Sequence, residues 1–287
     1  MPASTTRERA VAWATLWRQR VERLPVIGTI ITEWYRIEVV DRSMAIGAQA
    51  LLAVLPMLVV LAAFLPHDAA TTLYLEVSDL VGLKPSDSQP LGALMTGGEG
   101  SENAGWIGLL IALVSATSFA RALQRMYARA FALPWEARRG KLRASTIWLF
   151  TWIGFLAFLA WWGHLSGDLP LVTGIVVSVV LELGFWWWSL HYLLLGDCSW
   201  SDLLPTALLA TVAIAVVVRS SDLVMPVYAR SMTGQYGAFG FILALATWMV
   251  AMAGVLVLTA AAGALITQTP FWQTLAVRLG IPGAHTD

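Results

Sequence analysis

The sequence predicts an all-α fold: a polytopic membrane protein with six transmembrane helices, both termini in the cytoplasm and an amphipathic interfacial helix at the N-terminus. Composition is the first observation behind this prediction, because 58% of the residues are hydrophobic and only 13% are charged, against about 25% charged in an ordinary soluble domain. The second is that most of the 18 basic residues lie in two segments beside long apolar runs. Cationic flanks resist translocation, so this pattern orients the chain.

Six apolar runs are candidates for membrane spans, because a hydrocarbon core about 30 Å thick takes about 20 helical residues. Tryptophans near the ends of the third and fourth runs suit the membrane interfaces. The fifth run is marginal in length unless its helix continues past Arg219, and the sixth is long enough to tilt. The expected spans are 44–66, 105–120, 144–163, 169–189, 203–218 and 237–267.

The basic residues place both termini on the cytoplasmic side. The N-terminal segment 1–42 contains seven arginines, and segment 121–143 contains six arginines and one lysine. The three segments expected on the outside together contain only three basic residues. Positively charged segments stay in the cytoplasm, so we expect the transmembrane domain 43–267 to be followed by a cytoplasmic tail, 268–287.

Two segments outside the spans have helical periodicity. In 1–42, apolar residues recur on one stripe flanked by arginines, which suits a helix on the cytoplasmic lipid surface with its arginines reaching phosphates. A helix packed against the cytoplasmic ends of the bundle would show the same pattern. The outer segment 67–103 is acidic and contains a short amphipathic stretch, for which we expect a helix on the outer surface.

Three arginines follow the second span at intervals of four residues: Arg121, Arg125 and Arg129. This spacing would place them in a ridge on one face of a continuous helix. Guanidinium groups match phosphate oxygens, and such a ridge can hold anionic lipid headgroups or phosphorylated substrates. The alternative is a topology signal, since cytoplasmic arginines are what the positive-inside rule produces.

Glu182 is the only carboxylate within an expected span, where an ionisable side chain is costly and suggests a functional site. It could accept a proton during transport, or pair with an arginine of the ridge. A structural salt bridge, or a protonated acid bonded to a neighbouring helix, would explain it equally well. Gln49, a polar residue of the first span, is a further candidate for a cavity shared with Glu182 and the arginines.

Small and bend-permitting residues mark places where helices can approach or shift. Three alanines of the second span form a small-residue stripe beside the ridge, which lets a neighbouring helix approach closely. A proline interrupts the first span, and glycines around a tyrosine permit a bend where the last span begins. The candidates for helix bending or packing are Pro56, Ala112, Ala116, Ala120, Tyr236, Gly237 and Gly240.

The sequence argues against an enzyme, a metal site and a cofactor. The four histidines are scattered along the chain, and the single cysteine, Cys198, allows neither an intramolecular disulfide nor a cysteine-based metal cluster. There is no phosphate-binding glycine loop, nucleophile elbow or paired acidic motif. Nothing suggests a nucleic-acid-binding surface, so we expect the partners to be membrane lipids with anionic headgroups.

Three segments together are typical of one bacterial protein family. They are 55–58, with its Leu-Pro-Met-Leu run, 118–131, which follows the second span, and 236–240 with Trp248. This series resembles the YihY/BrkB/YhjD family of membrane proteins, and the likeness extends in order over 34–267. The resemblance implies six membrane helices, cytoplasmic termini, a location in the bacterial inner membrane and a role in envelope integrity.

Members of that family have been labelled ribonuclease BN. The residues argue against such an activity here, because hydrolysis of RNA requires metal ligands or an acid–base pair on the cytoplasmic side. The family also tends to end its last span in Gly-Ala-Glu, whereas Leu265 follows Gly263 and Ala264 in this chain. No role of that acidic group is therefore carried over.

These observations predict a protein of envelope integrity that moves or presents a lipid or an anionic envelope precursor. Arg121, Arg125 and Arg129 would contact its phosphate, and Glu182 would couple to protons or to one of the arginines. The alternative is a non-transporting scaffold that recruits envelope proteins through the acidic outer segment and the N-terminal surface helix.

Overall fold

All the elements of the described chain are α-helices. The computed structural model describes residues 38–64, 102–134, 141–166 and 170–281, and these contain no strand, which confirms the all-α fold class. The amphipathic stretches predicted before the first span and in the outer segment lie outside the described residues. The helices are α3 (Val39–Phe64), α6 (Glu102–Ala130), α7 (Lys141–Ser166), α8 (Leu171–Leu193), α9 (Trp200–Tyr236), α10 (Ala238–Thr267) and α11 (Pro270–Arg278).

Three of these helices are long and apolar enough to cross a membrane. The crossing stretches are Val172–Leu193 of α8, Trp200–Ser221 of α9 and Ile242–Thr267 of α10. Large apolar side chains on them, such as Val176 and Val212, are more than half exposed, which suits contact with lipid rather than with water. These helices indicate a membrane protein.

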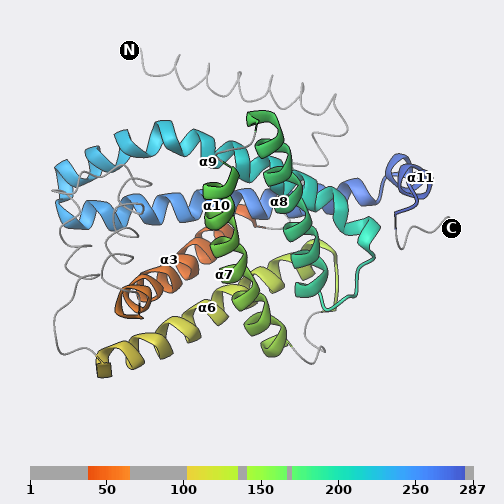
Figure 1. Ribbon diagram of the computed structural model, residues 1–287. Helices are drawn as coiled ribbons and strands as arrows, with labels where there is room; N and C mark the ends of the chain where they lie inside the picture. Colours follow the sequence, from red (N-terminus) through yellow and green to blue (C-terminus); the bar gives the residue numbers. More distant parts are fainter. Residues whose placement is uncertain (1–37, 65–101, 135–140, 167–169, 282–287) are drawn as a thin grey trace, which may run out of the picture.

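α9 extends well beyond the apolar run that predicted it. The helix has 37 residues, about 55 Å at 1.5 Å per residue, so it continues past Arg219. The fifth expected span, which was marginal in length up to that residue, thereby gains the length that it lacked. The helix ends at Tyr236, because Gly237 adopts a positive φ of 59° and donates its N–H to the Thr233 carbonyl oxygen at 2.8 Å. α10 then returns alongside α9, and the two form a long helical hairpin (Figure 1).

α6 lies next to α3, and small residues line their contact (Figure 1). Ala116 and Ala120, members of the predicted small-residue stripe, are buried, and Ala116 packs with Ala53 of α3. The side chains of Ala112 and Pro56 lie outside the described residues, although the helix α3 continues through position 56. The contact agrees with the close helix approach expected of the stripe.

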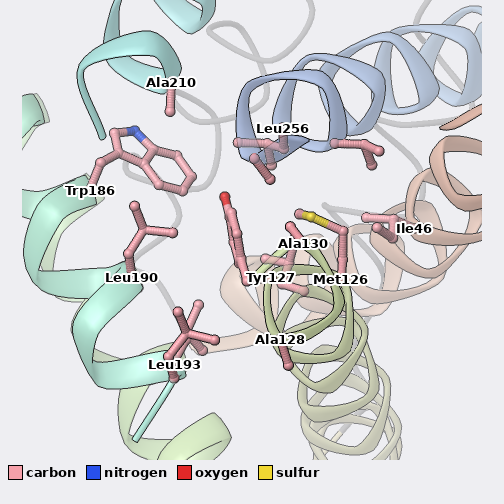
Figure 2. Packing of buried hydrophobic residues seen from close by; sticks show 14 of the residues in the cluster. Ile46, Met126, Tyr127, Ala128, Ala130, Trp186, Leu190, Leu193, Ala210 and Leu256 are labelled. Atoms are coloured by element: carbon pink, nitrogen blue, oxygen red, sulfur yellow. The ribbon is translucent and has the colours of Figure 1, made fainter. Parts of the chain in front are cut away.

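A fully buried tyrosine stands at the centre of the helical core. Figure 2 shows Tyr127 pointing from α6 toward Trp186 of α8, Ala210 of α9 and Leu256 of α10. Burial raises the pKa of the Tyr127 hydroxyl, so this group stays neutral around pH 7. The buried cluster around it draws residues from α3, α6, α7, α8, α9 and α10, so the core is shared by six of the described helices rather than by one pair.

Glycines let α10 pack very closely on its neighbours. A Cβ atom at Gly263 would lie 2.6 Å from Thr206 Cα of α9 and would overlap Thr206 Oγ1, and one at Gly47 of α3 would lie 2.7 Å from Val250 Cα of α10. Both distances are far shorter than van der Waals contact. A Cβ atom at Gly240 would likewise meet the backbone near the end of α9.

Gly263→Ala should lower the thermal stability of the protein in detergent, because the new methyl group must push α9 away from α10. Overpacking of this kind costs about 1–3 kcal/mol, which thermal unfolding followed by tryptophan fluorescence will show as a lower midpoint. Gly184→Ala is the matched control, since a Cβ atom there meets nothing within 4 Å. An unfolding midpoint for Gly263→Ala at or above that of the control would contradict the close packing.

Candidate functional site

One face of α6 near its end presents Arg121, Arg125 and Arg129, as their spacing predicted. Arg121 and Arg129 are exposed and Arg125 is half-buried. The ridge therefore occupies the face that neighbouring helices leave open. The side chains on the other faces of these turns are buried, and five of them are at most 2% exposed: Leu123, Gln124, Met126, Tyr127 and Ala128.

Arg42 of α3 extends this ridge across a helix interface. It lies one turn before Ile46, which stands beside Met126 of α6 (Figure 2). Burial lowers the pKa of Arg42, the positive charge of Arg129 lowers it further, and Glu38 acts in the opposite direction. We use the name arginine cluster for four residues: Arg42, Arg121, Arg125 and Arg129.

The positive charge on α6 has no carboxylate partner within the described part of the chain. Arg121, Arg125 and Arg129 form no ion pair there, whereas Arg42 Nη2 lies 3.4 Å from the exposed carboxylate of Glu38. Burial lowers the pKa of Arg125, and the charges of Arg121 and Arg129 lower it further. The group nevertheless stays protonated, because an arginine pKa starts far above neutrality. An anion would relieve the repulsion, and guanidinium forks bind phosphate oxygens in pairs.

Gln49 shares the α3–α6 interface with the cluster. Its neighbours on the same face of α3, Ile46 and Ala53, are buried in the clusters that include residues of α6. Gln49 Oε1 is itself buried and has no hydrogen-bond partner among the described residues. Seven residues separate it from Arg42, about 10 Å along the helix. The amide therefore stands in the same interface, about two turns beyond Arg42.

Glu182 lies on α8, one turn before the buried Trp186. The side chain is half-buried, and it forms no ion pair or hydrogen bond with a described residue. The pairing with an arginine of the ridge, one of the roles suggested by the sequence, is thus not formed in this part of the chain. The other suggested role, exchange of a proton, requires no such partner.

A buried hydrogen bond fixes α6 behind the cluster. Ser145 Oγ of α7 donates to Gln124 Oε1 at 2.9 Å, and both residues are fully buried. Sequence reasoning missed this contact, although Gln124 continues the small-residue stripe, where a polar residue often bonds to a neighbouring helix. From the sequence, Arg42 was counted only among the basic residues that orient the chain in the membrane. An antiparallel pairing of the first two spans would have brought that residue to the ridge.

A scan of protein-family models gave no match to this chain, and searches of curated proteins and of solved structures gave none either. The resemblance to the YihY/BrkB/YhjD family stays a prediction from three segments of the sequence. The geometry and charge of the site are therefore the evidence for its function.

Arg125→Gln should reduce the binding of phosphatidylglycerol to the purified protein about tenfold, since a hydrogen bond to a charged group contributes about 1.5–3 kcal/mol. Native mass spectrometry with added lipid measures the bound fraction. Arg278→Gln removes the same charge from an exposed site on α11 and serves as the control. Equal losses in the two variants would show that only net charge matters and would contradict a specific site.

Proposed function

We propose that this protein is a six-span protein of the bacterial inner membrane that binds an anionic lipid or a phosphorylated envelope precursor and moves or presents it. The observation behind the proposal is the arginine cluster, in which three arginines of α6 have no carboxylate partner among the described residues. Clustered guanidinium groups at a membrane surface favour phosphate headgroups. Envelope integrity, the role implied by the family resemblance, is consistent with such a ligand.

The proposed orientation puts the cluster at the cytoplasmic headgroups. Arg42 precedes the apolar part of α3, and the ridge follows the apolar part of α6, so both belong to the same end of an antiparallel helix pair. With both termini in the cytoplasm, that end faces the inner leaflet. The anionic lipids of the inner leaflet would then lie next to the cluster.

Movement of the ligand would need a proton acceptor and helices that can shift. Glu182 is the candidate acceptor, because an ionisable group inside a membrane helix is costly unless it has a function. Pro56 on α3 is a candidate bend, as are Gly237 and Gly240 at the turn between α9 and α10. Gln49 Oε1 would offer a hydrogen-bond acceptor along the α3–α6 interface.

In reconstituted vesicles, Arg125→Ala and Glu182→Gln should each slow the transbilayer movement of fluorescent phosphatidylglycerol by about tenfold or more, the first by loss of phosphate binding and the second by loss of the proton acceptor. Quenching of the outer leaflet with dithionite measures the rate. Arg278→Gln vesicles and protein-free vesicles are the controls. Equal rates for wild type and both variants would contradict the assigned roles.

A non-transporting scaffold is the second candidate, supported by the acidic composition of the outer segment 67–103. Cross-linking that recovers a stoichiometric envelope protein, together with no lipid movement in vesicles, would favour it. An intramembrane enzyme or nuclease stays disfavoured, because the sequence offers no catalytic cluster.

The orientation can be tested with single cysteines in a Cys198→Ser background. Ser231 at the end of α9 and Gln273 of α11 are both exposed. A membrane-impermeant maleimide added to intact cells should label Ser231→Cys at once and Gln273→Cys only after permeabilisation, because the first lies outside and the second inside. The reverse labelling order would overturn the proposed orientation without touching the helical fold.

A further inference from the structure

A second basic site lies on other helices and shares no residue with the arginine cluster. It is a cavity of about 410 Å³ between the start of α7 and the end of α8, lined by Arg143, Ala144, His191, Tyr192, Leu195 and Gly196. The volume suits a small ligand or a lipid headgroup. Binding in this cavity is independent of the proposed function, because the arginine cluster contributes nothing to its walls.

The chain builds one wall of the cavity with a tight turn after α8. Leu195 and Gly196 have positive φ values of 59° and 78°, and the Gly196 N–H donates to the His191 carbonyl oxygen at 3.0 Å. A Cβ atom at Gly196 would lie 3.6 Å from His191 Nε2, so the turn passes directly beside the imidazole. Asp197 follows in this turn, but it does not line the cavity.

His191 is held in one orientation by two contacts. Its Nδ1 atom lies 3.2 Å from the carbonyl oxygen of Cys198, and its ring stacks on Trp200 with centroids 4.1 Å apart and planes at 18°. A carbonyl oxygen only accepts hydrogen bonds, so Nδ1 carries the hydrogen. In the neutral ring Nε2 is then an acceptor, available to a hydroxyl group.

Arg143 supplies the positive charge of the cavity. It lies in the first turn of α7 and is exposed, and it forms no ion pair with a described carboxylate. The positive end of the α7 dipole lies at the same place. The guanidinium fork and this dipole both favour an anionic oxygen, and phosphate suits the fork best.

Aromatic residues place the cavity at the depth of a membrane interface. Tyr192 stacks on Trp188 with centroids 5.0 Å apart, and the Trp187 indole donates to the Trp200 carbonyl oxygen at 2.8 Å. The crossing stretch of α8 ends beside the cavity, at Leu193. Tryptophan and tyrosine favour the headgroup level, where one side of the ring is apolar and the other is wet.

We infer that this cavity binds a phosphate ester that carries a hydroxyl group, with the phosphate on Arg143 and the hydroxyl donating to His191 Nε2. A phosphoglycerol headgroup has both parts. The ligand can be a membrane lipid or a soluble phosphoester, since the recognised chemistry is the same. A headgroup with an ammonium group fits less well, because the ammonium would lie near the charge of Arg143.

The test is calorimetric titration of the full-length protein in detergent with short-chain phosphatidylglycerol, glycerol 3-phosphate, short-chain phosphatidylethanolamine and short-chain phosphatidylcholine. Arg143→Gln should weaken phosphatidylglycerol binding about tenfold. His191→Phe, which keeps the stack on Trp200, should weaken it by a similar factor. Arg278→Gln should leave this binding unchanged, because it removes the same charge from an exposed position on α11 that does not line the cavity.

The outcomes separate the sources and the sites. Binding of phosphatidylglycerol alone identifies a lipid ligand, and binding of glycerol 3-phosphate as well identifies the phosphoester itself. Equal binding of phosphatidylethanolamine or phosphatidylcholine would overturn the assignment of a hydroxyl group. Unchanged affinity in both Arg143→Gln and His191→Phe, or an equal loss in Arg278→Gln, would overturn the site.

A measurement on the unmodified protein guards against variants that fold poorly. Hydrogen–deuterium exchange should slow in 141–148 and 191–198 when short-chain phosphatidylglycerol is added, because the ligand would cover the start of α7 and the turn after α8. Unchanged exchange in both segments at saturating lipid would overturn the inference.

Discussion

α6 packs against several helices over its last turns, and this packing determines where charged residues can lie on it. A guanidinium group in place of Leu123 or Met126 would lose its hydration in that core. Burying even an uncharged polar group without a hydrogen bond costs about 2–7 kcal/mol, and burying a charge costs more. The arginines therefore occupy the one open face. Behind them, Gln124 accepts a hydrogen bond from Ser145 of α7 at 2.9 Å. The buried bond and the buried alanines fix the rotation of α6, and this rotation brings the ridge next to Arg42.

α9 is joined to its neighbours by tryptophan indoles. An unpaired polar group in apolar surroundings is costly, so each indole N–H favours the helix position at which it finds an acceptor. Close glycine contacts between α9 and α10 add steric complementarity where the surfaces are otherwise uniformly apolar. The indole bonds run from Trp187 to the Trp200 carbonyl oxygen, from Trp248 to Ser221 Oγ and from Trp272 to the Ser201 carbonyl oxygen, at 2.8, 2.8 and 3.1 Å.

The two basic sites differ in their physical character. The arginine cluster brings several guanidinium groups together, so its attraction for anions depends on charge and is sensitive to salt. The cavity beside Arg143 has a single guanidinium, an imidazole with a defined acceptor and aromatic walls, so it distinguishes headgroups by their hydrogen-bonding groups. If both sites face the inner leaflet, a headgroup can be concentrated by the first and recognised by the second.

Local properties of the chain were enough to predict the helices and the ridge. Long apolar runs give helices in lipid because backbone groups must be satisfied within the segment, and a spacing of four puts Arg121, Arg125 and Arg129 on one face. Hydropathy did not predict the end of α9, because it indicates only which part of a helix lies in lipid. The helix ends where it does because of the backbone conformation of Gly237. The tertiary structure alone decided that Arg42 meets the ridge and that Arg143 and His191 share a cavity, because these contacts join residues far apart in the sequence through the packing of separate helices.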